Sequence, residues 1–164
     1  MAYTVCGWYE GIPSYYNNAS NSSQNTINTV NTRYGNIYTG EKWQCIEFIR
    51  RYLVLRHGIT FEPVKNVYEF KNVSEFYSLI TESPVPVRLH TYGLPMENDI
   101  LILSWEDTGH VAIVAGIDRN NGLVYTVDQN GEPEQWENER YSRAYSIYSN
   151  QIMGWLRYQL PQLE

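Results

Sequence analysis

The sequence predicts an α+β domain in which N-terminal helices pack on an antiparallel sheet of about six strands. Apolar residues recur every three or four positions over residues 45–57 and 66–80, which is the spacing of amphipathic helices. From residue 86 onward, short apolar runs alternate with turn residues instead, a pattern typical of antiparallel strands. With 43% hydrophobic residues, the 164-residue chain is long enough to bury a core, and we expect one domain over residues 1–164.

The first predicted helix begins at a cysteine. The preceding segment 38–42 is polar and contains a glycine, so we expect a loop there. Gly58 follows the helix as a plausible stop. Cys45 therefore falls in the first turn, where free backbone N–H groups and the helix dipole favour the thiolate, the reactive form of cysteine. The alternative is that Cys45 is a buried and inert thiol.

The rest of the chain supplies a second helix, a loop and the strands. The pattern predicts the second helix over residues 66–80 and a long surface loop over the Asn-, Ser- and Thr-rich segment 14–36. The expected strands lie near residues 86–91, 100–104, 110–117, 123–129, 142–148 and 152–158.

A histidine begins the third of these strands, after the turn 106–109. The turn residues 118–122 predict a hairpin, and if it is centred near Asn120, Asp128 lies across from Ala112 and Asn130 across from His110. Either polar residue could then accept a hydrogen bond from the imidazole and fix its tautomer. A slip of one residue would turn both away. The alternatives are a structural strand-end histidine and a turn-flanking acid, but together with Cys45 these residues favour a thiol hydrolase.

Composition excludes several other classes of protein. A net charge of −6 argues against nucleic acid as a partner and is compatible with a cationic ligand. The N-terminus has no signal-peptide pattern and no stretch reaches membrane-spanning length, so we expect a cytoplasmic protein without a membrane partner. We also expect no disulfide between Cys6 and Cys45 in that compartment. Metal-ligand spacings and glycine-rich phosphate loops are missing, so no metal or cofactor is expected.

The motifs around the cysteine and histidine resemble those of the CHAP family, the cysteine, histidine-dependent amidohydrolases/peptidases. Within it, the closer resemblance is to the glutathionylspermidine amidase domains. The likeness runs over most of the chain and rests on Gly40-Glu41-Lys42-Trp43-Gln44-Cys45-Ile46-Glu47-Phe48-Ile49-Arg50-Arg51-Tyr52-Leu53, Asp107-Thr108-Gly109-His110-Val111-Ala112-Ile113, Val127-Asp128-Gln129-Asn130, Gln135-Trp136 and Gly154-Trp155. It implies a papain-like fold.

The resemblance also implies roles for individual residues. Cys45 would be the nucleophile, His110 the general base and acid, and Asp128 the orienting carboxylate. The related amidases look to have Glu at the Asp128 position, so Asn130 could share this role. Gln44 would be a second oxyanion donor beside the Cys45 N–H.

Arg50 matches an arginine that resembles a contact to a glutathione carboxylate in the family. The alternative for this arginine is an ordinary helix position, either solvated or paired with Glu47.

The resemblance implies a small-molecule substrate, a conjugate of glutathione and a polyamine, whose amide bond the thiol would hydrolyse. Two rival functions use the same fold. One is a CHAP-type peptidoglycan amidase or endopeptidase, and the other is a non-catalytic binding module.

Overall fold

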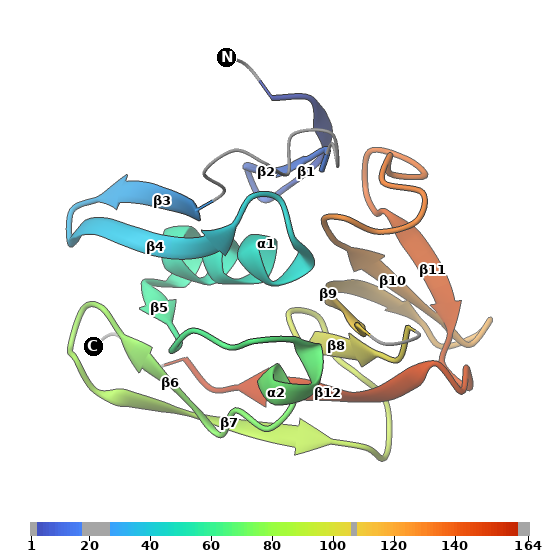
Figure 1. The fold of residues 1–164 in the computed structure, drawn as a ribbon. Helices are drawn as coiled ribbons and strands as arrows, with labels where there is room; N and C mark the ends of the chain where they lie inside the picture. The colour runs from blue at the N-terminus through green and yellow to red at the C-terminus, as the bar shows by residue number, and fades with distance from the viewer. Residues whose placement is uncertain (1–2, 18–26, 106–107, 161–164) are drawn as a thin grey trace.

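A computed structural model describes residues 3–17, 27–105 and 108–160 of the chain. The helical segments are α1 (Cys45–Tyr52), a π-helical turn (Leu53–His57) and α2 (Val67–Phe70). The strands are β1 (Val5–Tyr9), β2 (Ile12–Tyr15), β3 (Ile27–Thr32), β4 (Gly35–Glu41), β5 (Ile59–Thr60), β6 (Glu75–Ser78), β7 (Pro84–His90), β8 (Ile100–Leu103), β9 (His110–Asp118), β10 (Leu123–Val127), β11 (Arg143–Ser146) and β12 (Ile152–Tyr158). Figure 1 shows α1 lying between the two small hairpins and the main sheet.

The main sheet is antiparallel and has its most buried strand in the middle. Among the described residues it has eight strands in the order β11-β10-β9-β8-β12-β7-β6-β5. All four residues of β8 are buried, because alternate side chains enter two different apolar clusters. Ile100 and Ile102 join the cluster that includes α1 residues, whereas Leu101 and Leu103 join a smaller cluster with Val114. Both faces of the central strands are therefore covered.

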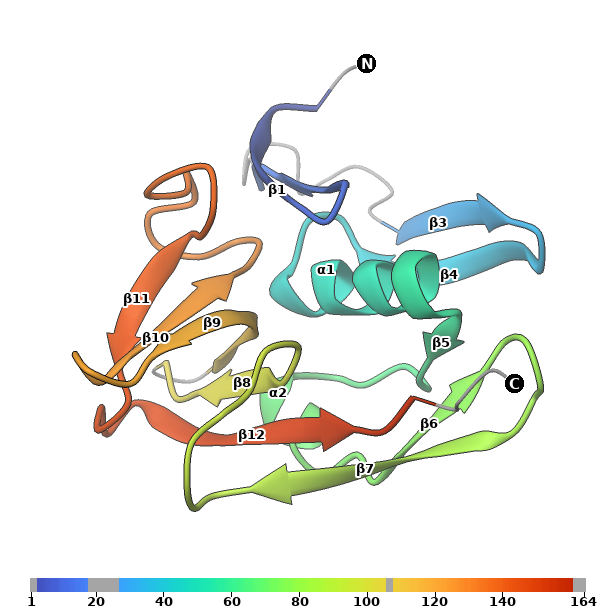
Figure 2. The same ribbon diagram turned by 180° about the vertical axis from the view of Figure 1, so that it is seen from behind.

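The helix that starts at Cys45 begins and ends as the sequence predicts. α1 begins at Cys45, and the π-helical turn that continues it ends at Gly58, which adopts the left-handed conformation with φ 64° that favours glycine. The apolar side of the helix is anchored in the larger cluster by Phe48, Ile49 and Leu53, each with 0% exposure. Figure 2 shows this helix from behind, running above the strands. Burial of one face thus fixes the direction of the helix and the place of its first residue.

The N-terminal part of the fold differs from the prediction. No N-terminal helix precedes α1 in the described residues; instead β1 pairs with β2 and β3 pairs with β4 in two antiparallel hairpins. The segment 38–42, predicted as a loop, is mostly strand β4, and the predicted loop 14–36 contains β3. Residues 18–26 of that loop lie outside the described residues. The prediction failed because these strands are polar and largely exposed, so no apolar alternation marks them.

The second predicted helix and the number of strands were also wrong in part. α2 covers only Val67–Phe70, and residues 75–78 form strand β6 against β7. Phe70 and Phe76 are both buried, so the apolar spacing correctly marked core residues, but it did not require one continuous helix. With β5 and β6 added, the sheet has eight strands in place of the expected six. The expected strands from residue 86 to 158 are confirmed, with small shifts at their ends.

A bulge in the β9–β10 hairpin decides which residues face the site. Near the turn, Tyr125 pairs with Gly116, but after the bulge Thr126 pairs with Val114 and Val127 with Ile113. Continued by one residue, this register places Asp128 across from Ala112, on the same face as His110. Without the bulge, Asp128 would lie across from Ile113 and point to the opposite face.

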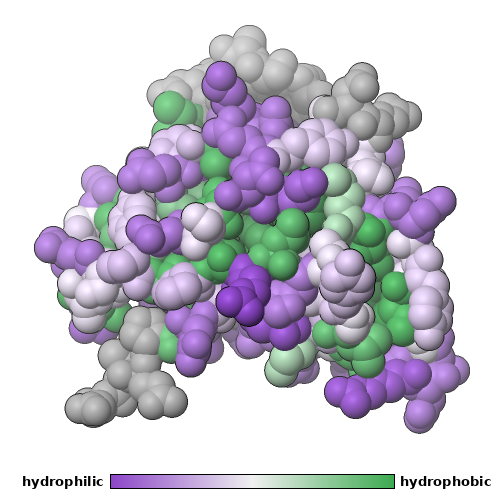
Figure 3. Space-filling view, turned by 90° about the horizontal axis from the view of Figure 1, so that it is seen from below, coloured by the Kyte–Doolittle hydropathy of each residue, from purple (hydrophilic) through white to green (hydrophobic). Residues whose placement is uncertain are grey.

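Within the described part of the chain, no helix is long and apolar enough to cross a membrane. Seen from below, the surface mixes hydrophobic and hydrophilic side chains, with green patches interrupted by purple ones (Figure 3).

Candidate active site

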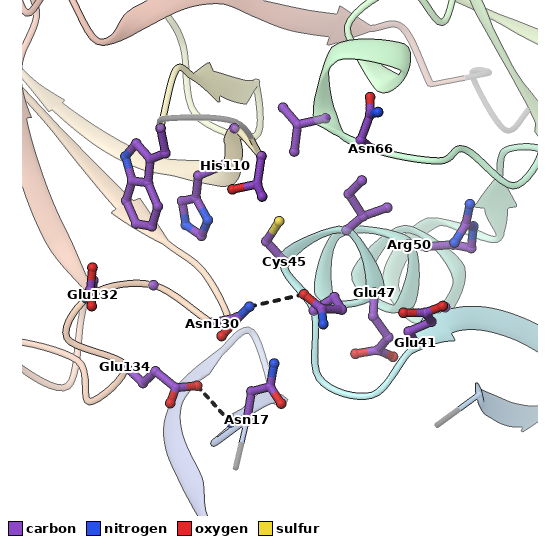
Figure 4. A pocket seen from close by; sticks show the side chains of 18 of the residues that line it. Asn17, Glu41, Cys45, Glu47, Arg50, Asn66, His110, Asn130, Glu132 and Glu134 are labelled. Atoms are coloured by element: carbon purple, nitrogen blue, oxygen red, sulfur yellow. Dashed lines mark hydrogen bonds between the residues drawn. The ribbon is translucent and has the colours of Figure 1, made fainter. Parts of the chain in front are cut away.

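Cys45 lies in an open groove at the N-terminal end of α1. The groove has a volume of about 1320 Å³, and its lining includes Cys45, His110 and Trp105. Gln44 is the N-cap residue and its side chain does not cap the helix, so the first-turn N–H groups are not occupied by it. Cys45 is half-buried and not in a disulfide. Figure 4 shows its sulfur directed towards the imidazole of His110.

His110 and Asp128 form a short, buried hydrogen bond. Nε2 of His110 lies 2.7 Å from Oδ2 of Asp128, and both side chains are almost fully buried. An ionised carboxylate only accepts hydrogen bonds, so the Nε2 proton is the donor in this pair. Nδ1 is then the nitrogen left for the side of the ring that faces Cys45. The structure thus brings together the cysteine, histidine and acid that the sequence singles out.

His110 and Asp128 each stabilise the charged form of the other. Burial alone lowers the pKa of His110, but hydrogen bonds with Asp128 and Cys45 outweigh it and raise this pKa to about 9. Burial likewise acts to raise the pKa of Asp128, but the hydrogen bond and charge of His110 and the charge of Arg143 lower it below its usual range. The imidazolium and the carboxylate are therefore the favoured forms at neutral pH.

Asn130 and Gln44 contact each other. Nδ2 of Asn130 donates to Oε1 of Gln44 over 3.1 Å (Figure 4). Asp128 accepts the hydrogen bond that His110 donates, so the alternative in which Asn130 orients the imidazole is not the arrangement found here. Both amide side chains lie beside Cys45 on the groove wall.

Arg50 is a buried cation on the groove wall, only 2% exposed. Its guanidinium donates to the backbone carbonyl oxygens of Thr39, Phe61 and Glu62. It also lies over the Phe61 ring, with 4.0 Å from Cζ to the ring centroid. Burial lowers the pKa of Arg50 from its ordinary value. Since Glu47 pairs with Arg51 and not with Arg50, neither of the ordinary helix alternatives describes this arginine.

A buried polar network, which sequence analysis missed, holds α1 against the end of β10. Glu47 accepts hydrogen bonds from Arg51, Gln129 and Thr39. Gln129 also donates to the backbone oxygen of Gln44 over 2.9 Å, directly before the cysteine. Because Gln129 follows Asp128 in the chain, this network joins the Cys45 helix to the segment that carries Asp128. The four-residue spacing of Glu47 and Arg51 was the visible signal.

Two further residues next to His110 were also missed. The indole of Trp105 stacks on the imidazole, with centroids 4.0 Å apart and an interplanar angle of 7°. Arg143, from β11, places its Nε 3.5 Å from Oδ2 of Asp128. No local motif marks Arg143, because it reaches Asp128 through the pairing of β10 with β11. Trp105 lies only five residues before His110, at the turn closed by the Thr108 and Gly109 N–H groups.

Charged side chains line the groove on both sides. On the side of α1 and α2 these are Arg50 and Lys65 together with Glu41 and Glu47, and beyond His110 and Asn130 they are Glu132 and Glu134. Among the residues that the structure describes, no group of histidine, cysteine, aspartate or glutamate side chains could hold a metal ion.

Comparison with known proteins agrees with this geometry. The CHAP domain family matches residues 33–130, which include α1, β8, β9 and all of β10. The chain belongs to the CHAP domain family. The match contains Cys45, His110, Asp128 and Asn130.

Curated relatives of this CHAP chain are longer enzymes. It is 29% identical over 154 residues to the "Bifunctional glutathionylspermidine synthetase/amidase" of Escherichia coli (strain K12), covering 77% of this chain and 25% of that protein. It is 28% identical over 140 residues to the "Trypanothione synthetase" of Crithidia fasciculata, covering 81% and 21%. The chain thus spans about a quarter or less of the length of these relatives. Family and relatives together support a hydrolase function of the amidase type.

Proposed function

We propose that this CHAP chain is a cysteine-dependent amidase that hydrolyses the amide bond between glutathione and a polyamine. The observation that carries the proposal is the Cys45 thiol at a helix N-terminus, facing an imidazole whose other nitrogen is bonded to a buried carboxylate. This is the arrangement by which an amide can be attacked and its leaving amine protonated. The raised pKa of His110 supports an imidazolium as the proton donor.

In the proposed first step, the Cys45 sulfur bonds to the amide carbonyl carbon and a tetrahedral oxyanion forms. The Cys45 backbone N–H donates to that oxyanion. The second donor is the side-chain N–H of Gln44, whose Oε1 accepts a hydrogen bond from Asn130. His110 then gives its Nδ1 proton to the amine nitrogen, the carbon–nitrogen bond breaks and the polyamine leaves. Asp128 keeps the imidazole in place throughout.

In the second step, water hydrolyses the thioester left on Cys45. His110, now neutral, takes a proton from the water as its oxygen bonds to the acyl carbon. The carbon–sulfur bond breaks, glutathione leaves, and the thiolate–imidazolium pair is restored. Balance over both steps requires one water for each amide cleaved and no cofactor.

The substrate class is supported by three charged residues of the groove and by the likeness to the glutathionylspermidine synthetase/amidase. Glutathione has carboxylates, for which Arg50 is a suitable guanidinium partner. The leaving amine must lie near His110, because that residue protonates it, and Glu132 and Glu134 line the groove beyond His110. A polyamine cation directed to that side would meet the two carboxylates.

The test is release of glutathione and spermidine from glutathionylspermidine by the native protein and by Cys45→Ala. We expect release by the native protein and none above background by the variant. Cys6→Ala is the matched control: this thiol is buried, and burial raises its pKa to about 11, so removing it should leave release unchanged. Release by Cys45→Ala would contradict the proposed nucleophile. No release by the native protein, with Cys45 still alkylated, would contradict the substrate, and peptidoglycan fragments would be the next substrate to assay.

A further inference from the structure

Arg143 reaches the candidate active site from the edge strand of the sheet. In the register of the sheet, Arg143 pairs with Thr126, and Thr126 pairs with Val114. Alternation along the strands therefore places Arg143 on the same face as Asp128 and His110. Arg143, Asp128 and His110 therefore share this face with a fourth polar residue, Thr126.

The Arg143 guanidinium makes contacts in three directions. Its Nε lies 3.5 Å from Oδ2 of Asp128, the same oxygen that bonds to His110. Its terminal nitrogens donate to the backbone oxygens of Glu132 and of Pro133, the latter over 2.6 Å. Its Cζ also lies 5.9 Å from the ring centroid of Trp105, which stacks on His110. The Arg143 guanidinium thus contacts Asp128, the groove wall at Glu132 and Pro133, and the Trp105 ring that stacks on His110.

The close approach of these groups depends on a glycine. A Cβ built on Gly131 would lie 2.6 Å from Oδ2 of Asp128 and would collide with the Arg143 guanidinium. Gly131 and Glu132 both line the groove. The segment that passes between Asp128 and the groove therefore leaves room for an ion pair that any larger residue would disturb.

Besides His110, Arg143 is a cation whose charge acts on Asp128. Asp128 has one oxygen shared between His110 and Arg143, and its side chain is 0% exposed. A buried carboxylate is costly unless it is paired, so both cations contribute to keeping it ionised. The other titratable groups whose charge acts on or through Asp128 come from β1, the segment after β10 and β11: they are Cys6, Glu134 and Tyr145. None of these three is a cation.

We propose that Arg143 is a positioning residue for the amidase reaction: its charge keeps Asp128 ionised against His110, and its terminal nitrogens fasten the groove wall at Glu132 and Pro133. The first role acts on the proton transfer, since a neutral Asp128 would no longer stabilise the imidazolium. The second role acts on substrate binding, because Glu132 lies on the side of the leaving amine. The proposal rests on the proposed function for its kinetic consequences, but not for its effect on the titration of Asp128.

The two roles are separated by two variants. Arg143→Met removes both the positive charge and the hydrogen-bond donors. Arg143→Lys keeps the charge but replaces the planar guanidinium, with its two terminal nitrogens, by a single ammonium group. Titration of the Asp128 carboxyl carbon by 13C NMR needs no substrate. We expect its midpoint to move to higher pH in Arg143→Met and to stay near the native value in Arg143→Lys. Arg140→Met, which removes an exposed positive charge three residues earlier, should leave the midpoint unchanged.

The kinetic arm uses glutathionylspermidine. We expect kcat to fall by roughly tenfold or more in Arg143→Met, because proton transfer through His110 is impaired. In Arg143→Lys we expect a higher KM with kcat closer to native. An unchanged Asp128 midpoint in folded Arg143→Met would overturn the charge role, and an unchanged KM in Arg143→Lys would overturn the wall role. If the native protein does not cleave the substrate, the proposed function fails while the titration still decides the charge role.

Discussion

The two reactive groups of the candidate site are held by different kinds of structure. Cys45 begins a short helix whose groove-side end is fixed by a buried ionic network centred on Glu47 and Arg51. His110 begins a strand in the middle of an eight-stranded sheet, where backbone ladders on both sides and two apolar clusters fix its position. The helix adds a few strong polar contacts to its apolar anchor, whereas the strand is held by many weak contacts.

This difference determines how each side should respond to a single substitution. Removing one partner from a buried ion pair leaves an uncompensated charge, so the full penalty falls on one residue. A strand in a ladder shares its stabilisation over many hydrogen bonds and apolar contacts, so one side-chain change costs less. We therefore expect the helix side to be the more fragile of the two, although the chemistry depends on both.

The largest expected effect is on the helix side, from Arg51→Met. The Arg51 guanidinium and the Glu47 carboxylate are 4% and 0% exposed, and Arg51 also donates to the backbone oxygen of Pro13 and to Gln129. Methionine fills part of the volume but leaves Glu47 without its cation. We expect the free energy of unfolding to fall by about 3–5 kcal/mol, measured by urea denaturation.

The matched control for that prediction is Arg56→Met, five residues further along the chain. Arg56 also pairs with a glutamate, Glu10, but these side chains are 48% and 35% exposed. A solvent-exposed pair contributes less than about 1 kcal/mol. If both variants lost the same small free energy of unfolding, the ionic network would not be what fixes the helix. The contrast between the α1 helix and the β9 strand would then disappear.

A smaller loss of stability is expected on the sheet side, from Asp128→Asn. The substitution keeps the shape but replaces a charged hydrogen bond to His110 by a neutral one, which costs about 1.5–3 kcal/mol of unfolding free energy at pH 7. The backbone ladder should keep the strand in register. Amidase activity should nevertheless fall by about 10²-fold or more, because the imidazolium loses its counter-charge. An Asp128→Asn variant less stable than Arg51→Met would reverse the comparison.

The same pair sets the pH dependence of stability. The pKa of His110 is raised to about 9 in the folded protein, so its contribution is fully present below the unfolded value and is lost as the pH rises towards 9. The pKa of Asp128 is lowered, so its contribution is present above its unfolded value and is lost as the pH falls through its folded pKa. Unfolding measured between pH 6.5 and 9 should show a decline in the native protein that is flatter in Asp128→Asn. Parallel curves would show that the pair does not stabilise the fold.

The sequence predicts local features of this site better than the contacts between distant segments. Cys45 at a helix start and His110 at a strand start follow from periodicity and turn residues, which are local. The contact of Asp128 with His110 was predicted from a hairpin register, but that register holds only beyond a bulge that no sequence pattern marked. Arg143 belongs to a strand pairing further along the chain, which periodicity cannot predict. Trp105 lies in the turn just before His110, but no pattern marks its stacking on the imidazole.

The polar hairpins show the same limit for the fold. Strands β3 and β4 have little apolar alternation, because most of their side chains are exposed and only Thr39 and Gly40 are buried. The α1 side therefore depends on residues that look like loop in the sequence. Thr39 is one of the donors to Glu47. The polar network could not be predicted, because it joins segments that carry no periodic signal. It is also sensitive to substitution, because each of its links is a single contact.

The smallest effect that we predict concerns strand β2, which contacts both sides. Its residue Pro13 accepts a hydrogen bond from Arg51, and Ser14 donates to the backbone oxygen of Asp128 over 2.7 Å while being 0% exposed. Ser14→Ala removes only the second of these bonds. The Asp128 backbone oxygen still accepts a hydrogen bond from Trp136, so it is not left unsatisfied, and we expect the free energy of unfolding to fall by about 1 kcal/mol.

The control is Ser83→Ala, at an exposed serine that bonds within its own turn, which should change the free energy of unfolding by less than about 0.5 kcal/mol. A loss in Ser14→Ala as large as that in Arg51→Met would mean that β2, rather than the ionic network, is what holds the helix and the sheet together at the groove.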